Sequence, residues 1–99
     1  MSINKINPDG AINLANAIVE QAAKDYLKAK KRLYLENPNN KARIEKYQWR
    51  LEETINFFNS KWYRTLTSID ASWLMKKLDE EFEEWKNDPE RQNESFDEE

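Results

Sequence analysis

The sequence predicts an all-α protein: an antiparallel helical hairpin followed by a third helix, forming a small three-helix bundle with a short helical elbow. Two observations carry this prediction. Apolar residues recur every three or four positions in three long segments, which is the spacing of one helical face. Proline and glycine number only four in 99 residues and lie outside those segments. We expect a lead-in at residues 1–10, one helical domain at 11–87 and a disordered acidic tail at 88–99.

The first helix is predicted at residues 11–36. It follows Asn7-Pro8-Asp9-Gly10, whose Asn and Asp side chains can accept hydrogen bonds from the free amides of a first turn. It ends before Pro38, because a residue that precedes proline avoids helical geometry. Its apolar face comprises Ile12, Ala15, Ile18, Val19, Ala22, Tyr26, Ala29 and Leu33.

The second helix is predicted at residues 39–58, after the turn Asn37-Pro38-Asn39-Asn40. The connection is short, so this helix should run antiparallel to the first. Its inner face comprises Ile44, Tyr47, Leu51, Ile55 and Phe58.

A helical elbow at residues 61–66 and a third helix at 71–86 complete the prediction. Ser60 and Asp70 precede them as N-cap residues. Residues 58, 62, 66 and 69 should fill the end of the bundle. The core stripe of the third helix comprises Ala71, Leu74, Met75, Leu78, Phe82 and Trp85, and Asn87-Asp88-Pro89 ends the helix.

Composition makes an enzyme the less favoured class. The chain has no histidine, no cysteine and a single glycine, Gly10. It therefore lacks the usual zinc ligands, a thiol nucleophile and a glycine-rich phosphate loop. We expect no metal and no cofactor. No apolar run reaches the roughly 20 residues that span a bilayer, and the amino terminus does not resemble a signal peptide. We expect a cytoplasmic protein that does not enter membranes.

The formal charge of −3 conceals a polarity along the chain. Residues 79–99 hold eleven acidic and two basic side chains, a balance of −9, whereas residues 1–78 hold fourteen basic and eight acidic ones, a balance of +6. A basic body with an acidic end favours a charged partner or a tail that screens its own body, while solvated surfaces on both parts would explain it equally well.

Three large aromatic residues do not fit the predicted core. On a helical wheel Trp49 points nearly opposite the inner face of residues 39–58, and Phe57 points to its side. Trp73 lies about 140° from the core stripe of residues 71–86 at 100° per residue. Exposed aromatics of this size call for a second packing surface. Contact with a neighbouring helix could absorb Phe57, and a homodimer or another protein could cover Trp49 and Trp73.

Basic residues are also ordered along the helices. Arg43, Lys46 and Arg50 form one stripe toward Phe57, and Lys61 and Arg64 continue it into the elbow. A second set, opposite the first apolar face, comprises Lys24, Lys28, Lys31 and Arg32. Such residues can hold phosphates, so nucleic-acid binding is the alternative function. Interspersed carboxylates and the absence of a known nucleic-acid-binding motif place it second.

Carboxylates gather at residues 79–84. Consecutive residues on a helix radiate outward and do not converge on a cation, so we interpret this run as a solvated outer face. Its Glu80, Glu81 and Glu84 could instead meet a basic groove on a partner. Serines beside lysines and Asp70 suggest a small hydrolase as a third function, but Ser60, Ser68 and Ser72 lie where helix capping explains them better.

The elbow carries a resemblance. The order Phe57-Phe58, Ser60, Trp62, Leu66-Thr67, Ile69-Asp70, Trp73-Leu74 and Leu78 resembles small accessory proteins of phages and prophages of low-GC Gram-positive bacteria. The likeness is good over residues 57–78 and loose over 17–78. Ala71 stands where such proteins often have glycine, so a close approach of the backbone there is in doubt. The resemblance implies no catalytic residue.

In that context we expect a non-enzymatic binder of one host or phage protein in the host cytoplasm. It would inhibit or regulate a nucleic-acid machine or a defence nuclease, as an anti-CRISPR does. Trp49, Phe57 and Trp73 would be the apolar anchors, because binding hot spots are enriched in large aromatics and arginine. The flanking partner-binding residues would be Arg43, Lys46, Arg50, Arg64, Glu80, Glu81 and Glu84.

Overall fold

The structure, a computed structural model, describes residues 8–92 and the side chains of residues 14–90. Every regular element in residues 8–92 is a helix, so the all-α prediction is confirmed. The elements are α1 (Pro8–Leu35), α2 (Lys41–Phe58), α3 (Lys61–Leu66), α4 (Ala71–Lys86) and α5 (Pro89–Gln92). None of the described helices is both long and apolar enough to cross a membrane.

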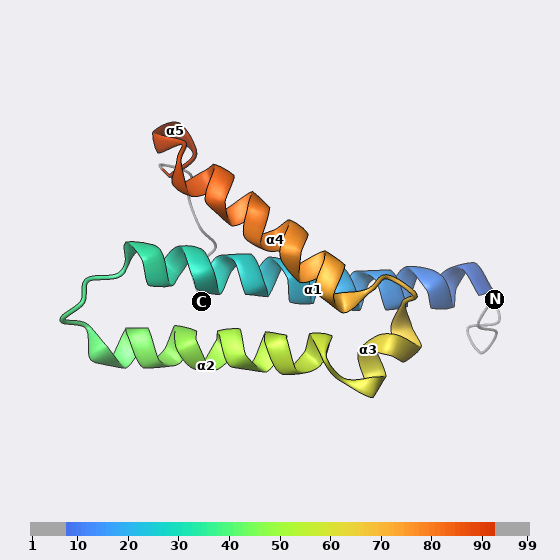
Figure 1. The fold of residues 1–99 in the computed structure, drawn as a ribbon. Helices are drawn as coiled ribbons and strands as arrows, with labels where there is room; N and C mark the ends of the chain where they lie inside the picture. Colours follow the sequence, from blue (N-terminus) through green and yellow to red (C-terminus); the bar gives the residue numbers. More distant parts are fainter. Residues whose placement is uncertain (1–7, 93–99) are drawn as a thin grey trace, which may run out of the picture.

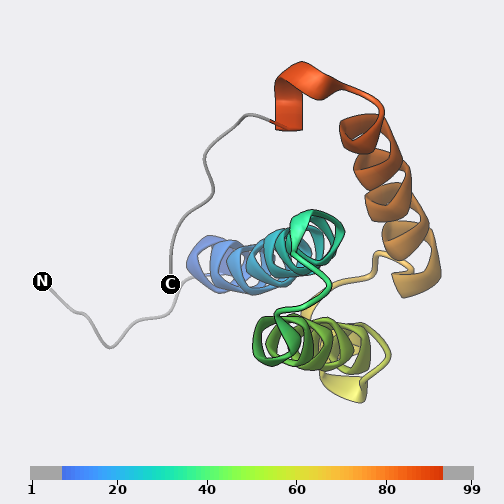
Figure 2. The ribbon, with the colours of Figure 1, turned by 90° about the vertical axis from the view of Figure 1, so that its left-hand side faces the viewer.

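Helix α1 is the centre of the arrangement. Helix α2 runs antiparallel along it, and α4 crosses it obliquely on another side (Figure 1). The view along the hairpin shows α2 and α4 against different sides of α1 (Figure 2). Both views show α4 moving away from α2 toward its carboxyl end. The three long helices therefore form an open arrangement, in which α1 is shared and α2 keeps an uncovered flank.

Two helix starts differ from the prediction. Helix α1 begins at Pro8, within the expected lead-in, because proline has no N–H to satisfy and a φ angle suited to the first helical position. Helix α2 begins at Lys41, two residues later than expected. Asn40 accepts a hydrogen bond from the N–H of Arg43 at 3.3 Å and is the N-cap. The bounds of α3 and α4 match their predictions.

The elbow is fixed by its predicted caps. Ser60 Oγ accepts the N–H of Tyr63 at 3.1 Å, and Asp70 Oδ2 accepts the N–H of Trp73 at 2.9 Å. These bonds satisfy first-turn amides that a helix leaves unpaired. The expected tail at 88–99 is wrong for residues 89–92, which form α5. Its remainder, residues 93–99, lies outside the described residues.

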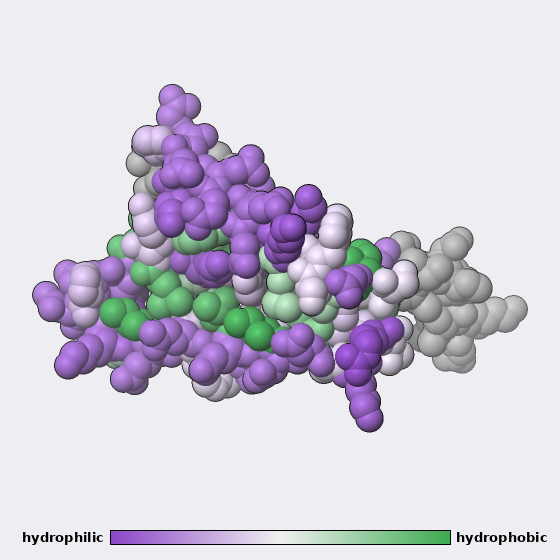
Figure 3. All heavy atoms as spheres, viewed as in Figure 1, coloured by the Kyte–Doolittle hydropathy of each residue, from purple (hydrophilic) through white to green (hydrophobic). Residues whose placement is uncertain are grey.

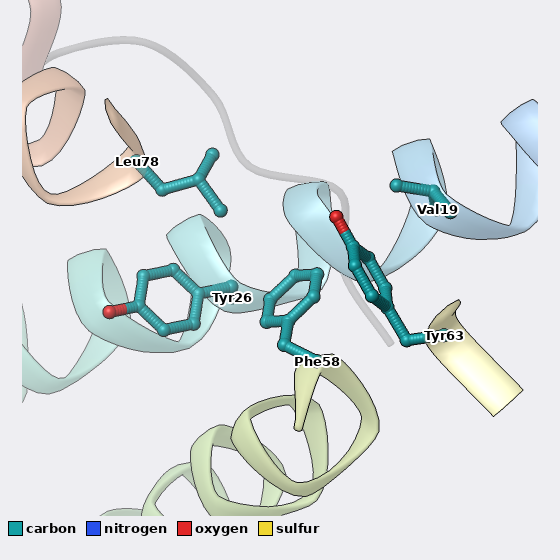
Figure 4. Close-up of a cluster of buried hydrophobic side chains, with 5 residues drawn as sticks. All are labelled: Val19, Tyr26, Phe58, Tyr63 and Leu78. Carbon is teal, nitrogen blue, oxygen red and sulfur yellow. The ribbon is translucent and has the colours of Figure 1, made fainter. Parts of the chain in front are cut away.

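The core lies where α1, the end of α2, α3 and α4 meet. Phe58 and Tyr63 are 0% and 1% exposed. The Phe58 ring lies between those of Tyr26 and Tyr63, with edge-to-face centroid distances of 6.0 and 5.7 Å (Figure 4). Val19 and Leu78 close the cluster from α1 and α4. Helix α4 therefore joins the hairpin chiefly through α1, and its Leu78 packs into this cluster beside Phe58 and Tyr63.

Two residues expected in this end of the bundle are not buried. Trp62 is 56% exposed and Ile69 is 44% exposed. The six-residue α3 turns Tyr63 inward, and the neighbouring Trp62 then points about 100° away on the helical wheel. Thr54 is buried on α2 although its polarity kept it out of the predicted face, and its hydroxyl donates to the carbonyl of Leu51 at 2.8 Å.

A second aromatic cluster joins the carboxyl ends of α1 and α4. The Tyr34 ring meets Phe82 and Trp85 edge to face, and the latter two rings stack at 5.9 Å. The Lys30 ammonium lies 4.8 Å from the Phe82 ring centroid, and that of Lys31 lies 5.3 Å from that of Trp85. Cations over ring faces are attracted by the aromatic quadrupole, so both lysines contribute to this contact.

Candidate protein-binding surfaces

Three of the four tryptophans lie largely on the surface. Trp49, Trp62 and Trp73 are 59%, 56% and 53% exposed, whereas Trp85 is 1% exposed. The wheel prediction that Trp49 and Trp73 face away from the core is therefore correct, while Trp62 was missed. Burying such side chains against a partner would remove a large apolar area from water.

A groove runs between α1 and α2, and we call it the aromatic groove. It has a volume of about 320 Å³ and its surface is mostly apolar. Phe57 and Trp62 stand on one wall, with their ring centroids 5.6 Å apart in an edge-to-face arrangement. Ile18 and Ala22 come from α1. The other lining residues are Gln21, Asp25, Glu53 and Thr54.

Phe57 links this groove to the core. Besides Trp62, its ring contacts Phe58 and Tyr63, both at 5.7 Å between centroids. Its side chain is half-buried, as expected for a residue that a neighbouring helix absorbs in part. A partner that binds against Phe57 would therefore contact a ring that three neighbouring aromatic rings hold in place.

A smaller hollow of about 220 Å³ adjoins the aromatic groove. The two share Asp25, Glu53 and Thr54, and the hollow adds Trp49 and Arg50. The Asp25 carboxylate accepts a hydrogen bond from the Gln21 amide at 3.0 Å, which fixes part of the shared rim. The predicted anchors Trp49 and Phe57 thus line two neighbouring hollows that share three residues, and the predicted Arg50 lines the same hollow as Trp49.

The aromatic groove lies away from α4. Its α1 wall comes from Ile18, Ala22 and Asp25, whereas α1 meets α4 through Tyr26 and Lys30. Figure 3, seen from the side on which α4 crosses α1, shows that the outer surface of α4 is mostly hydrophilic and that apolar side chains follow the seam between α1 and α2 on that side. The aromatic groove is on the opposite side of the hairpin. Trp73, the third predicted anchor, is on α4, so the structure does not bring it into the groove of the same molecule.

The predicted acidic residues of α4 differ in their surroundings. Glu80 lies 3.5 Å from the Lys77 ammonium, which in turn lies 5.8 Å from the Trp73 ring centroid. Glu84 is exposed and Glu81 is half-buried. Trp73, Lys77, Glu80 and Glu84 therefore share one outward side of α4.

Asp79 corrects the interpretation of residues 79–84 as a purely solvated face. Its Oδ1 accepts hydrogen bonds from the Tyr26 hydroxyl at 2.6 Å and the Lys30 ammonium at 2.7 Å. We call these three residues the clasp, because they join α1 to α4. Burial, the hydrogen bond to Asp79 and the charge of Asp79 all raise the pKa of Tyr26. The partners are about fifty residues apart, so periodicity gave no sign of this contact.

Several basic residues that the nucleic-acid alternative requires make contacts within the molecule. Lys24 pairs with Glu20 at 3.2 Å, and Lys31 lies over Trp85. Lys28 and Arg32 are half-buried. Of the other predicted cations, Arg43 lies 3.7 Å from Glu36, and Lys46 lies 5.6 Å from the Tyr47 ring centroid. A phosphate backbone would have to compete with several of these contacts.

A cavity of about 460 Å³, the elbow cavity, lies between the end of α2, α3 and the start of α4. Its described lining contains one carboxylate, Asp70, which already caps α4, and no lysine. Arg64, a predicted binding residue, lines it with Ser68 and Ser72. The lining therefore offers neither the carboxylate pair nor the Ser–Lys pair that a small hydrolase would need. Burial and the nearby Asp70 charge raise the pKa of Tyr63.

Comparisons with known proteins identified no relative of this chain. No protein-family model matches the chain, and neither a curated protein nor a solved structure matches it significantly. Among the described residues, no group of three or more carboxylates is placed to hold a metal ion. The aromatic groove and the exposed tryptophans therefore define the candidate binding surface.

Proposed function

We propose that this chain is a non-enzymatic protein-binding module whose aromatic groove receives an apolar segment of another protein. The observation that carries the proposal is the groove itself, with Phe57 and Trp62 on one wall and Trp49 in the adjoining hollow. A groove between two helices is a common receptor for an amphipathic helix, whose apolar side chains enter at three- and four-residue spacing.

The target class that we propose is a nucleic-acid machine or defence nuclease of the host, which binding would inhibit or regulate. The likeness of residues 57–78 to phage accessory proteins supports this part of the proposal. The position of Trp62 adds to it, because the resembling stretch contributes both Phe57 and Trp62 to the groove wall. Direct nucleic-acid binding is the less favoured alternative, since Lys24 and Lys31 are engaged within the fold.

The test is affinity capture by the tagged full-length chain from a nuclease-treated lysate of a low-GC Gram-positive host. We expect specific proteins to be captured by the wild type. Trp62→Ala and Trp49→Ala should each lower their yield at least about tenfold, as hot-spot truncations do. Lys61→Ala is the matched control, because Lys61 is an exposed neighbour of Trp62 that does not line the groove.

The contrary result is equally specific. Capture that both tryptophan variants leave unchanged would exclude the groove as the binding site. Association with mixed-sequence DNA that weakens steeply with salt, and that Lys24→Ala and Lys28→Ala reduce, would instead support the nucleic-acid alternative.

A further inference from the structure

The outward side of α4 carries the complement of the α2 wall of the aromatic groove. Phe57, Glu53, Arg50 and Lys46 follow one another at steps of four, three and four residues toward the amino end of α2; we call this set the α2 stripe. Trp73, Lys77, Glu80 and Glu84 follow at steps of four, three and four residues toward the carboxyl end of α4; we call this set the α4 stripe.

Each stripe occupies one side of its helix. At 100° per residue, the four members of either stripe lie within about 60° of one another. Phe57 and Glu53 line the aromatic groove, Arg50 lines the adjoining hollow, and Lys46 is exposed beyond it. All four members of the α4 stripe are exposed. Both stripes can therefore be reached from outside the molecule.

The two stripes match residue by residue when the helices run antiparallel. Trp73 then meets Phe57 at the end of the aromatic groove that Trp62 lines. Lys77 meets Glu53, Glu80 meets Arg50, and Glu84 meets Lys46. The spacings are identical, and eleven residues at 1.5 Å each give both stripes a length of about 16 Å. These pairings depend on the sign of each charge, and each side chain can exchange its contacts within one molecule for those with the second copy.

We propose that the aromatic groove of one copy receives the α4 stripe of a second copy, with the two helices antiparallel. Opposite charges in register fix the direction of the docked helix, and the tryptophan supplies the apolar contact. The contact cannot form within one molecule, because α4 meets α1 on a different side from the groove.

The two docking surfaces are different parts of the chain, so the contact is heterologous. Such contacts produce a ring if they close and a growing chain if they do not. The average mass should therefore increase with concentration, and it should increase less at high salt because exposed charges are screened. This inference is independent of the proposed function, although a second copy would compete with an external partner for the groove.

The test is sedimentation equilibrium of the purified full-length chain over a concentration series reaching the millimolar range. We expect reversible self-association in the wild type. Glu80→Lys and Arg50→Glu should each lower the association constant at least about tenfold, since they place like charges opposite one another. The double variant Glu80→Lys/Arg50→Glu restores the pairing with reversed signs, and its association constant should return to within about threefold of the wild type.

Matched controls carry the same charge changes outside the stripes. Glu52→Lys lies on another side of α2, and Lys61→Glu is an exposed residue of α3. Both should leave the wild-type association constant within about twofold, and circular dichroism of every variant should show folded helices. The control changes alter net charge by the same amounts, so they separate a local effect from a general one.

Three results would overturn the proposal. The first is a wild type that stays monomeric throughout the series, which leaves the groove to an external partner. The second is single variants that associate as strongly as the wild type. The third is a double variant whose association constant remains as low as those of the single variants. Capture assays with Lys77→Glu keep the two proposals apart. Lys77 is exposed on α4 and outside the groove, so its change should weaken self-association by facing Glu53 with a like charge and leave capture of an external protein intact.

Discussion

Two groups of aromatic side chains on the same helices have opposite environments. Phe58, Tyr63 and Trp85 are almost completely buried, whereas Trp49, Trp62 and Trp73 keep more than half of their surface exposed. Neither amino-acid composition nor secondary-structure propensity distinguishes the buried aromatic residues from the exposed ones. Their angle on the helix separates them, because Tyr63 and Trp62 are neighbours in sequence but point about 100° apart. The first group holds the helices together, and the second forms the surface that we propose for binding another protein.

The largest loss of stability is expected when a member of the buried group is truncated. Phe58→Ala should reduce the free energy of unfolding by about 3–5 kcal/mol, because Phe58 is fully buried and its ring contacts Tyr26 and Tyr63. Urea unfolding followed by far-ultraviolet circular dichroism measures this change. A loss below about 1 kcal/mol would mean that the elbow is not part of the cooperative core.

The clasp should have a smaller effect. Tyr26→Phe keeps the ring against Phe58 but removes the hydroxyl that donates to Asp79. We expect the free energy of unfolding to fall by about 1.5–3 kcal/mol, the range for hydrogen bonds to charged groups. Tyr34→Phe is the matched control, since Tyr34 is half exposed and its ring, which the change keeps, makes the contacts with Phe82 and Trp85. Equal stability of Tyr26→Phe and wild type would show that the clasp adds nothing to the contact of α1 with α4.

Alkaline pH tests the same contact without replacing its residues. The folded pKa values of Tyr26 and Tyr63 are raised, so the folded state retains protons that the unfolded chain releases. Their contribution to stability is complete below the unfolded tyrosine pKa of about 10 and declines as pH rises above it. The loss is at most about 1.4 kcal/mol per pH unit for each tyrosine.

Unfolding free energies measured at a series of pH values above neutrality provide that test. In Tyr26→Phe the free energy of unfolding should fall less steeply with pH above 10, because one of the two titrating tyrosines is absent. A wild-type stability that stays constant or increases above pH 10 would contradict the environment assigned to both hydroxyls.

Periodicity was sufficient for most of the fold. The apolar spacing located all three long helices, and Ser60 and Asp70 were correctly identified as caps because each precedes a helical pattern with an oxygen that can accept a first-turn amide. The wheel also placed Trp49 and Trp73 outside the core, since an 18-residue and a 16-residue helix define their faces well. Asn40 was not identified as the cap of α2, because the neighbouring Asn37 and Asn39 have the same capping side chain.

The missed features depend on contacts between distant segments. In α3, six residues make too short a pattern to show which of Trp62 and Tyr63 faces inward. Asp79 appeared to belong to an acidic surface because its partners, Tyr26 and Lys30, lie on another helix. The aromatic groove needs the relative placement of α1 and α2, which no single-helix wheel contains.

The most direct test of the division into two aromatic groups is the free energy of unfolding of the double variant Trp49→Ala/Trp73→Ala. Both side chains are more than half exposed and lie on different helices, so we predict a change of less than about 1 kcal/mol from the wild type. A loss of several kcal/mol would contradict the account, because it would place these tryptophans among the residues that hold the fold together.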